Sequence, residues 1–210
     1  MLRVGITMTG LEQVELWSHW VGGSAALLVL VIVLAGIQRG LKRPTGQETG
    51  NARSLRRSPY FYPLATIAFF GLVWLLWLPL PLDLSTSLRI CALICGGLLY
   101  LSGLGLVLWG RLELGKHYFV STSRSAALFA DHRLVTSGPY AWLRHPMYSG
   151  LVLTGLGGLL LYRTWAFVFL LVCFLAVLLR TRPEEKILAE TFGEEWQAYC
   201  RRVPRFVPHP

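Results

Sequence analysis

Long apolar blocks, separated by short polar stretches, dominate this sequence. Five such blocks cover residues 16–37, 60–80, 88–109, 146–162 and 164–179. A helix needs about 20 mostly apolar residues to cross a bilayer. The pattern therefore predicts an all-α, integral membrane bundle of about five transmembrane helices. Because only Arg163 and Thr164 separate the last two blocks, these two should form a tight helical hairpin.

Glycines are frequent within the third and fourth blocks. They are Gly96, Gly97, Gly103 and Gly105 in the third, and Gly150, Gly155, Gly157 and Gly158 in the fourth. Small residues let membrane helices approach each other closely. We therefore expect these two blocks to pack tightly against neighbouring helices.

The segment 183–202 is too polar to cross a membrane. Pro183 suits the first turn of a helix, and three glutamates, Glu184, Glu185 and Glu190, favour its N-terminal half. Apolar residues then recur at spacings of three and four, as Ile187, Leu188, Phe192, Trp196 and Tyr199. This pattern predicts a C-terminal amphipathic helix on the cytoplasmic surface.

Composition and charge support a single membrane domain over residues 1–210. Three N-terminal spans are expected in 1–110, and a loop, the helical hairpin and a C-terminal cap in 111–210. Apolar residues make up 54% of the chain and charged residues only 15%, against roughly 25% in soluble domains. The net charge of +9 comes from Lys and Arg that flank the apolar blocks, 17 on one side and 3 on the other. This asymmetry predicts an N-terminus outside and a C-terminus in the cytoplasm, and it argues against nucleic-acid binding.

The four cysteines show no metal-ligand spacing and no CxxC pair, so neither a zinc site nor a disulfide is expected. Cys91 and Cys95 share a helix face and are expected to be small packing residues. The first residues lack an apolar stretch directly after Arg3, so no cleaved signal peptide is expected.

Polar residues concentrate in two stretches, 131–148 and 180–185. The first precedes the fourth block and the second follows the fifth, so the hairpin should return both to the same membrane edge. Pro146 fits the first position of a helix, with His145 near its cap and Tyr148 half a turn further. Polar groups at membrane depth mark functional sites.

These residues also have ordinary structural explanations. Tyr, Trp and Arg anchor many membrane proteins at the headgroup level, and Arg180 and Arg182 can extend to the interface from the end of a span. Glu184 and Glu185 can favour a helix N-terminus. Anchoring at the interface is a sufficient explanation for Arg182, and the helix N-terminus is a sufficient explanation for Glu185. Arg180, however, directly follows the apolar run, and Glu184 lies four residues later. A cation and an anion at this position suit a zwitterionic ligand.

Two motifs support a more specific interpretation. The first is Leu134-Val135-x-x-Gly138-x-Tyr140-x-x-x-Arg144-His145-Pro146-x-Tyr148-x-Gly150. The second comprises Arg180-x-x-x-Glu184-Glu185, Phe192-Gly193 with Tyr199, and Val203-Pro204-Arg205. Together they resemble the isoprenylcysteine carboxyl methyltransferase family and, more loosely, the related phospholipid N-methyltransferases. The resemblance covers residues 130–206.

The resemblance implies a helical membrane methyltransferase that uses S-adenosylmethionine from the cytoplasm and a lipid-like or prenylated acceptor from the bilayer. Its implied cofactor-binding residues are His132, Arg133, Leu134, Val135, Tyr140, His145, Pro146, Met147, Tyr148 and Glu184. The family's substrate-side arginine falls on Arg180, and Arg144 is the second candidate catalytic residue. Ser125 stands where the family has a further polar contact.

The resemblance favours carboxyl O-methylation of an isoprenylcysteine-type acceptor, and other functions remain open. A carboxylate acceptor needs a cation such as Arg180 to orient it, whereas an amine acceptor needs a base. The first alternative is therefore a phospholipid or small-lipid N-methyltransferase. Two others are a sterol-type reductase with a nicotinamide cofactor and a non-enzymatic membrane scaffold. The compact N-terminal half favours a protein of a prokaryotic inner membrane, whose acceptor is then another lipid-like acid or thiol. The natural acceptor and the oligomeric state stay open.

Overall fold

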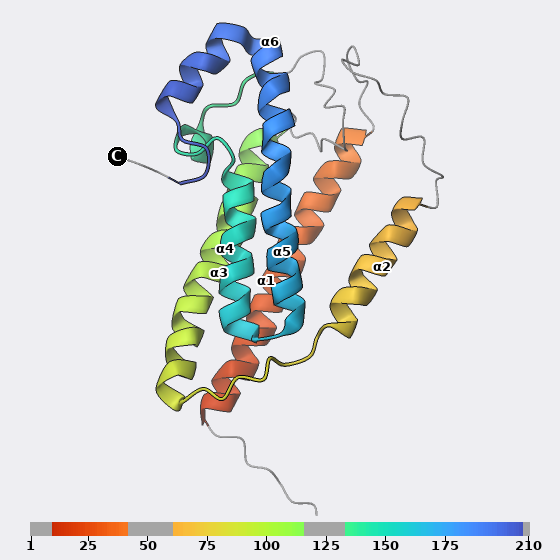
Figure 1. Ribbon diagram of the computed structural model, residues 1–210, viewed down its shortest axis with the longest axis vertical. Coiled ribbons are helices and arrows are strands. Elements are labelled where there is room, and N and C mark those ends of the chain that lie inside the picture. Colours follow the sequence, from red (N-terminus) through yellow and green to blue (C-terminus); the bar gives the residue numbers. More distant parts are fainter. Residues whose placement is uncertain (1–9, 42–60, 116–132, 208–210) are drawn as a thin grey trace, which may run out of the picture.

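A computed structural model describes residues 10–41, 61–115 and 133–207 of this chain (Figure 1). The helices in these ranges are α1 (Gly10–Leu41), α2 (Phe61–Leu75), α3 (Thr86–Leu114), η3 (Gly138–Ala141), α4 (Pro146–Tyr162), α5 (Trp165–Val177), η4 (Leu178–Arg180) and α6 (Thr181–Arg202). Apart from one isolated bridge between Pro79 and Thr164, the regular structure of the described residues is helical. The predicted all-α class is therefore confirmed.

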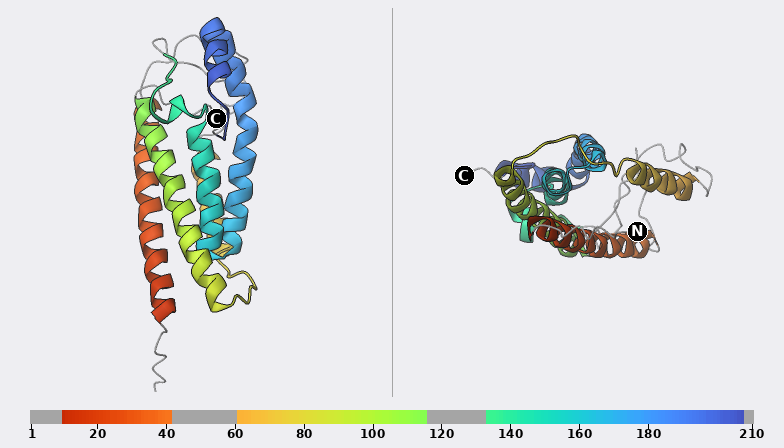
Figure 2. Two further views of the ribbon diagram at one scale, coloured as in Figure 1. Left: turned by 90° about the vertical axis from the view of Figure 1, so that its left-hand side faces the viewer. Right: turned by 90° about the horizontal axis from the view of Figure 1, so that it is seen from below.

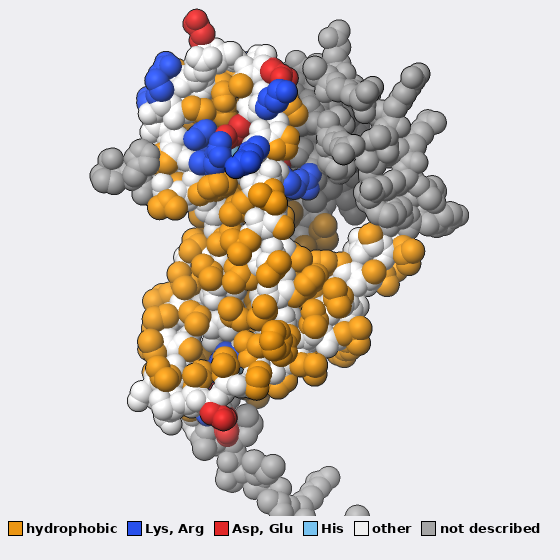
Figure 3. Space-filling view, in the orientation of Figure 1, with side chains coloured by type: hydrophobic (Ala, Val, Ile, Leu, Met, Phe, Trp, Pro, Cys, Tyr) orange, Lys and Arg blue, Asp and Glu red, His pale blue; other side chains and the backbone are white. Residues whose placement is uncertain are grey.

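Three helices of the described ranges are long and apolar enough to cross a bilayer: Gly10–Ala35, Thr86–Leu114 and Trp165–Arg202. Two further apolar helices, Leu64–Leu75 and Pro146–Tyr162, are shorter than the usual span. Figure 3 shows apolar side chains over the outside of the bundle, as expected for a surface that faces lipid. The chain is thus an integral, multi-pass membrane protein, and the exact number of five spans stays a prediction.

Glycines hold α3 and α4 together along their length. A Cβ atom added at Gly103 would lie 2.5 Å from the backbone nitrogen of Thr154, and one at Gly96 would lie 2.9 Å from the Cβ of Leu160. Gly97 and Gly105, by contrast, have no neighbour within 4 Å of such an atom. The predicted close approach is therefore confirmed for Gly96 and Gly103 and wrong for Gly97 and Gly105, which do not contact α4.

The second apolar block becomes helical only in part. Helix α2 ends at Leu75, whereas the apolar block continues to residue 80. Pro79 and Pro81 lack the N–H group that a helix requires, and the chain instead runs extended along the turn between α4 and α5. There the Leu80 N–H donates to the Arg163 carbonyl at 2.7 Å, and the Trp165 N–H donates to the Leu78 carbonyl at 3.0 Å. This segment closes one end of the bundle.

One further boundary and one side-chain prediction differ from what the sequence predicts. Helix α3 continues past residue 109 to Leu114, which places Arg111 in a helix and buries it, although it was predicted in a loop. Its guanidinium donates to the Gly115 carbonyl at 3.2 Å. Cys91 and Cys95 share a face of α3, as predicted, with their Sγ atoms 3.9 Å apart. Both are exposed, so the prediction that they are packing residues is wrong.

Helix α6 follows α5 almost without interruption. Its first turn contains Pro183, as predicted, but it begins at Thr181 directly after η4. Gly193, with φ of 49°, divides it. In Figure 1 the first part continues the line of α5, and the part after Gly193 folds back. This return is possible because glycine tolerates positive φ. Whether α6 lies on a cytoplasmic surface stays a prediction.

The two ends of the bundle differ in their charged groups. The end that carries η3 and α6 is here called the cap end, and the end at the α4–α5 turn is called the turn end (Figure 2). At the turn end, Glu15 pairs with Arg89 at 2.5 Å and with Arg163 at 2.8 Å. These arginines are two of the three basic residues predicted outside the cytoplasm, and the charge of Glu15 compensates both.

Exposed tryptophans lie at both ends of the bundle. They are Trp17, Trp74, Trp77 and Trp165 at the turn end, and Trp109 and Trp142 at the cap end.

Candidate functional site at the cap end

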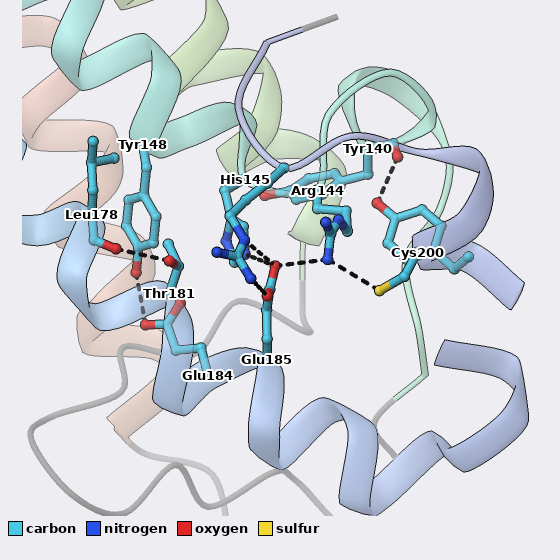
Figure 4. Close-up of polar contacts among 11 residues, drawn as sticks. Tyr140, Arg144, His145, Tyr148, Leu178, Thr181, Glu184, Glu185 and Cys200 are labelled. Atoms are coloured by element: carbon cyan, nitrogen blue, oxygen red, sulfur yellow. Dashed lines mark hydrogen bonds and ion pairs between the residues drawn. The ribbon is translucent and has the colours of Figure 1, made fainter. Parts of the chain in front are cut away.

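The two polar stretches predicted to meet do so at the cap end. His145 is the N-cap residue of α4 and Pro146 its first residue, while Glu184 lies in the first turn of α6. The Tyr148 hydroxyl donates a hydrogen bond of 2.7 Å to the Glu184 carboxylate (Figure 4). The short α4–α5 hairpin therefore brings residues 36 positions apart in the sequence into direct contact.

Glu185 is the centre of a buried charged cluster beside this pair. Its carboxylate accepts from the Arg144 guanidinium at 2.9 Å, from His145 Nε2 at 3.1 Å and from the Arg205 guanidinium (Figure 4). Burial alone would raise the pKa of Glu185, but the hydrogen bonds from His145 and Arg205 and the charge of Arg144 lower it to about 2. The carboxylate is therefore ionised at neutral pH.

The C-terminal segment 203–206, here called the C-terminal strap, binds the start of α4. The Arg144 N–H donates to the Pro204 carbonyl at 2.9 Å, and the His145 N–H donates to the Arg205 carbonyl at 3.2 Å. The Ser149 hydroxyl donates to the Phe206 carbonyl at 2.9 Å. The strap thus satisfies backbone groups at the entrance of α4 that would otherwise lack partners.

A second layer joins the part of α6 after Gly193 to η3. The Tyr199 hydroxyl donates to the Tyr140 carbonyl at 2.7 Å, and burial raises the pKa of Tyr199, which keeps this donor protonated. The Arg144 guanidinium donates to Cys200 Sγ at 3.1 Å and lies 6.0 Å from the centre of the Trp196 ring. Trp196 and Tyr199 also form a small apolar core with Val203. The cap is therefore a packed unit.

The other predicted residues occupy different surroundings. Arg133 is exposed, Val135 and Met147 are half-buried, and Pro146 is fully buried. Leu134 packs against the apolar core of the cap. Arg180 ends η4 and is half-buried, four residues before Glu184. His132 and Ser125 lie outside the described residues.

Two residues of this cluster, Glu185 and Arg205, were not predicted from the sequence. Their motif positions gave no sign of the contact. The prediction of Glu185 as an ordinary charge at a helix N-terminus is wrong, because the side chain is buried among three cationic or polar partners. Arg205 had no predicted role beyond the motif. A carboxylate pair directly after an apolar run is a signal that could have identified Glu185, because adjacent helix residues point about 100° apart and the two carboxylates therefore meet different surroundings.

The fold and this cluster define a helical membrane protein with a polar site at one end of its bundle. Comparison with known proteins is more specific. The profile of the phospholipid methyltransferase family matches residues 91–195, half of the chain. The chain belongs to this family.

Curated relatives agree with this assignment. The chain is 40% identical over 79 residues to the protein-S-isoprenylcysteine O-methyltransferase of Mus musculus, and 36% identical over 80 residues to that of Schizosaccharomyces pombe. Each match covers 37% of this chain, and 28% and 34% of the respective relative. The chain thus spans about a third of the length of these relatives. The resemblance found in the sequence motifs is confirmed.

A solved structure is similar as well. It is the eukaryotic intramembrane Ras methyltransferase named isoprenylcysteine carboxyl methyltransferase, with 20% sequence identity and a TM-score of 0.40. The similarity covers 73% of this chain and 54% of that one.

Proposed function

We propose that the cap-end cluster is the active site of an S-adenosylmethionine-dependent methyltransferase whose acceptor is a lipid-like molecule in the membrane. The observation that carries this proposal is the contact between Tyr148 and Glu184, which joins the two motifs at the mouth of the hairpin. Both residues lie within the region matched by the family. The names of the curated relatives favour O-methylation of an isoprenylcysteine carboxylate.

The chemistry of the residues present fits this cofactor. The half-buried Glu184 carboxylate can pair with an ammonium group or accept from ribose hydroxyls, and the Tyr148 hydroxyl holds it in place. The remaining wall is proposed to consist of His132, Arg133, Leu134, Val135, Tyr140, His145, Pro146 and Met147. When bound, S-adenosylmethionine supplies an electrophilic methyl group.

Arg180 is the proposed contact for the acceptor. It ends η4 at the close of an apolar helix, where a lipid would present its polar head. A carboxylate acceptor carries no proton, so it needs orientation and exclusion of water rather than a base. The planar guanidinium can bind a carboxylate through two parallel hydrogen bonds. Arg144, the other candidate, donates to Glu185, so we propose that it contributes by holding the entrance of α4.

Phospholipid N-methylation is the second candidate, because the matching family is described as phospholipid methyltransferase. An amine acceptor must lose a proton, so a base would be required. Among the residues that the structure describes, we propose Glu184 as the candidate for that base. The two functions therefore differ in whether Glu184 acts only on the cofactor.

Titration of S-adenosylhomocysteine into the purified protein in detergent tests the proposal. Binding is expected in the wild type and loss of binding in Glu184→Ala. Glu190→Gln, an exposed carboxylate on the same helix, serves as the control and should bind normally. Binding of a nicotinamide cofactor without any response to S-adenosylhomocysteine would instead support a reductase.

Arg180 variants separate the acceptor from the cofactor. Arg180→Lys keeps the charge but loses the forked geometry, so methyl transfer to a prenylcysteine analogue should fall by about a hundredfold in both Arg180→Lys and Arg180→Ala. Affinity for S-adenosylhomocysteine should change little. A parallel assay with phospholipid as acceptor distinguishes O- from N-methylation. Lost cofactor binding in the lysine variant would assign Arg180 to the cofactor, and full activity in the alanine variant would make it a membrane anchor.

A further inference from the structure

Glu185 has more polar partners than an ordinary helix-terminal charge. Its carboxylate receives Arg144 and His145 from the entrance of α4, and Arg205 from the C-terminal strap. These three partners come from two separate segments, and Glu185 itself belongs to a third, the first turn of α6. A single side chain therefore connects three of the described segments that surround the proposed site.

We propose that Glu185 is a positioning residue, which fixes the orientation and the protonated nitrogen of His145 and fastens the C-terminal strap to the start of α4. The inference rests on the proposed function, since the geometry it fixes is that of the proposed cofactor site. Glu185 and Arg205 themselves have no proposed contact with the cofactor or the acceptor.

The hydrogen bond to Glu185 decides which nitrogen of His145 carries the hydrogen. An ionised carboxylate only accepts hydrogen bonds, so the nitrogen that lies 3.1 Å from Glu185, Nε2, must carry the hydrogen. In neutral His145 the other nitrogen, Nδ1, then keeps its lone pair and is an acceptor. A carboxylate behind a histidine selects one tautomer and one ring orientation in this way at many sites. His145 is also the N-cap residue of α4, two residues before Met147 and three before Tyr148.

The negative charge of Glu185 holds the strap against the start of α4, because it pairs with an arginine from each. Arg144 and Arg205 both point at the one carboxylate, and the Arg144 side chain is only 15% exposed. Without Glu185 the two guanidinium groups would face each other, and a partly buried charge left without its partner is costly. The backbone bonds from Arg144 and His145 to the strap depend on the same close approach. Loss of the carboxylate should therefore loosen the strap and the start of α4 together.

Two variants and one control test the proposal in the full-length protein in detergent. Glu185→Gln keeps the shape and removes the charge, and Arg205→Met, at a 39% exposed side chain, removes the strap's partner. Glu190→Gln removes a carboxylate from the same helix at an exposed pair with Lys186. Three quantities are measured: the thermal midpoint, the affinity for S-adenosylhomocysteine, and the nitrogen NMR signals of His145, assigned through their loss in His145→Asn.

The expected results distinguish positioning from general stabilisation. Glu185→Gln should weaken the binding of S-adenosylhomocysteine about tenfold, and its His145 signals should change from the Nε2–H tautomer to a mixture. Arg205→Met should weaken binding as well, and the double variant should be no worse than Glu185→Gln alone, because both act through one contact. Glu190→Gln should change none of the three quantities.

Opposite results would overturn the proposal. An unchanged affinity together with an unchanged His145 tautomer in folded Glu185→Gln would leave Glu185 with a structural role only. If that variant does not fold, an unchanged affinity in Arg205→Met would have the same meaning. A wild type that shows the Nε2–H tautomer but does not bind S-adenosylhomocysteine would refute the proposed function and leave the contact of Glu185 with His145 intact.

Discussion

An alanine at Gly103 tests whether the contact between α3 and α4 holds the candidate active site in place. The new Cβ atom would lie 2.5 Å from the backbone nitrogen of Thr154 and 2.7 Å from the Gly150 carbonyl. Ordinary contact begins at 3.4 Å, so the two helices must separate by about 1 Å. Neither neighbour can yield alone, because both atoms belong to the backbone of α4.

The expected cost follows from this separation. Overpacking of a closely packed core costs about 1–3 kcal/mol, which lowers the ratio of folded to unfolded protein by about five- to 150-fold. The displacement should also reach the site, since Gly150 lies two residues after Tyr148 on α4. A shift of about 1 Å would break the 2.7 Å hydrogen bond to Glu184. Binding of S-adenosylhomocysteine should then weaken about tenfold.

Gly105→Ala provides the matched control. Gly105 lies two residues further along α3, and a Cβ atom there meets nothing within 4 Å. Alanine is also the better helix former, by up to about 1 kcal/mol. Equilibrium unfolding in detergent, followed by circular dichroism, compares the two variants. If Gly103→Ala is as stable as Gly105→Ala, the close packing of α3 and α4 does not contribute the expected free energy of unfolding.

Three shorter predictions concern single polar groups. Tyr148→Phe removes the donor to Glu184, so the affinity for S-adenosylhomocysteine should fall several-fold in titration while stability changes by about 1 kcal/mol. Glu15→Gln leaves Arg89 and Arg163 without their shared carboxylate, so unfolding in detergent should show a loss of about 1–3 kcal/mol, and an unchanged midpoint would refute this. The pKa of Glu185 lies at about 2 against a usual value of 4.5, so its ionised form stabilises the fold above pH 4.5. The stability difference between the wild type and Glu185→Gln should therefore be constant above this pH and decrease as the pH falls toward 2.

Hydropathy and spacing predicted most of the fold because the membrane restricts the choices. Apolar blocks that long can form only helices when they face lipid, and the two-residue link at Arg163 permits only a hairpin. The prediction failed where tertiary contacts decide the outcome. The end of α2 depends on backbone pairing between Leu80 and Arg163, which lie far apart in the sequence.

The candidate site was predictable in its location and not in its internal contacts. Topology alone brings the polar stretches around His145 and Glu184 to one membrane edge. Which of the two adjacent glutamates turns inward depends on how η4 joins α6, because each residue of a helix rotates the side chain by about 100°. The role of Arg205 depends on the turn at Gly193, which returns the end of the chain to the start of α4.

The distribution of the site over the chain bears on specificity. The described contacts of the cap come from α4, α6, η3 and the C-terminal strap. Helix α3 contributes the Gly110 carbonyl, which accepts a hydrogen bond from the Tyr140 hydroxyl of η3. The region that matches the family begins at residue 91, so it includes most of α3 and excludes α1 and α2. The proposed cofactor contacts Tyr148 and Glu184 lie inside this region, and we expect the apolar part of the acceptor to contact other walls of the bundle. Helix α2 contacts α5 through Phe69 and Phe169 and lies at the edge of the bundle (Figure 2), so we expect that a change in this wall would not disturb Glu184 or Glu185.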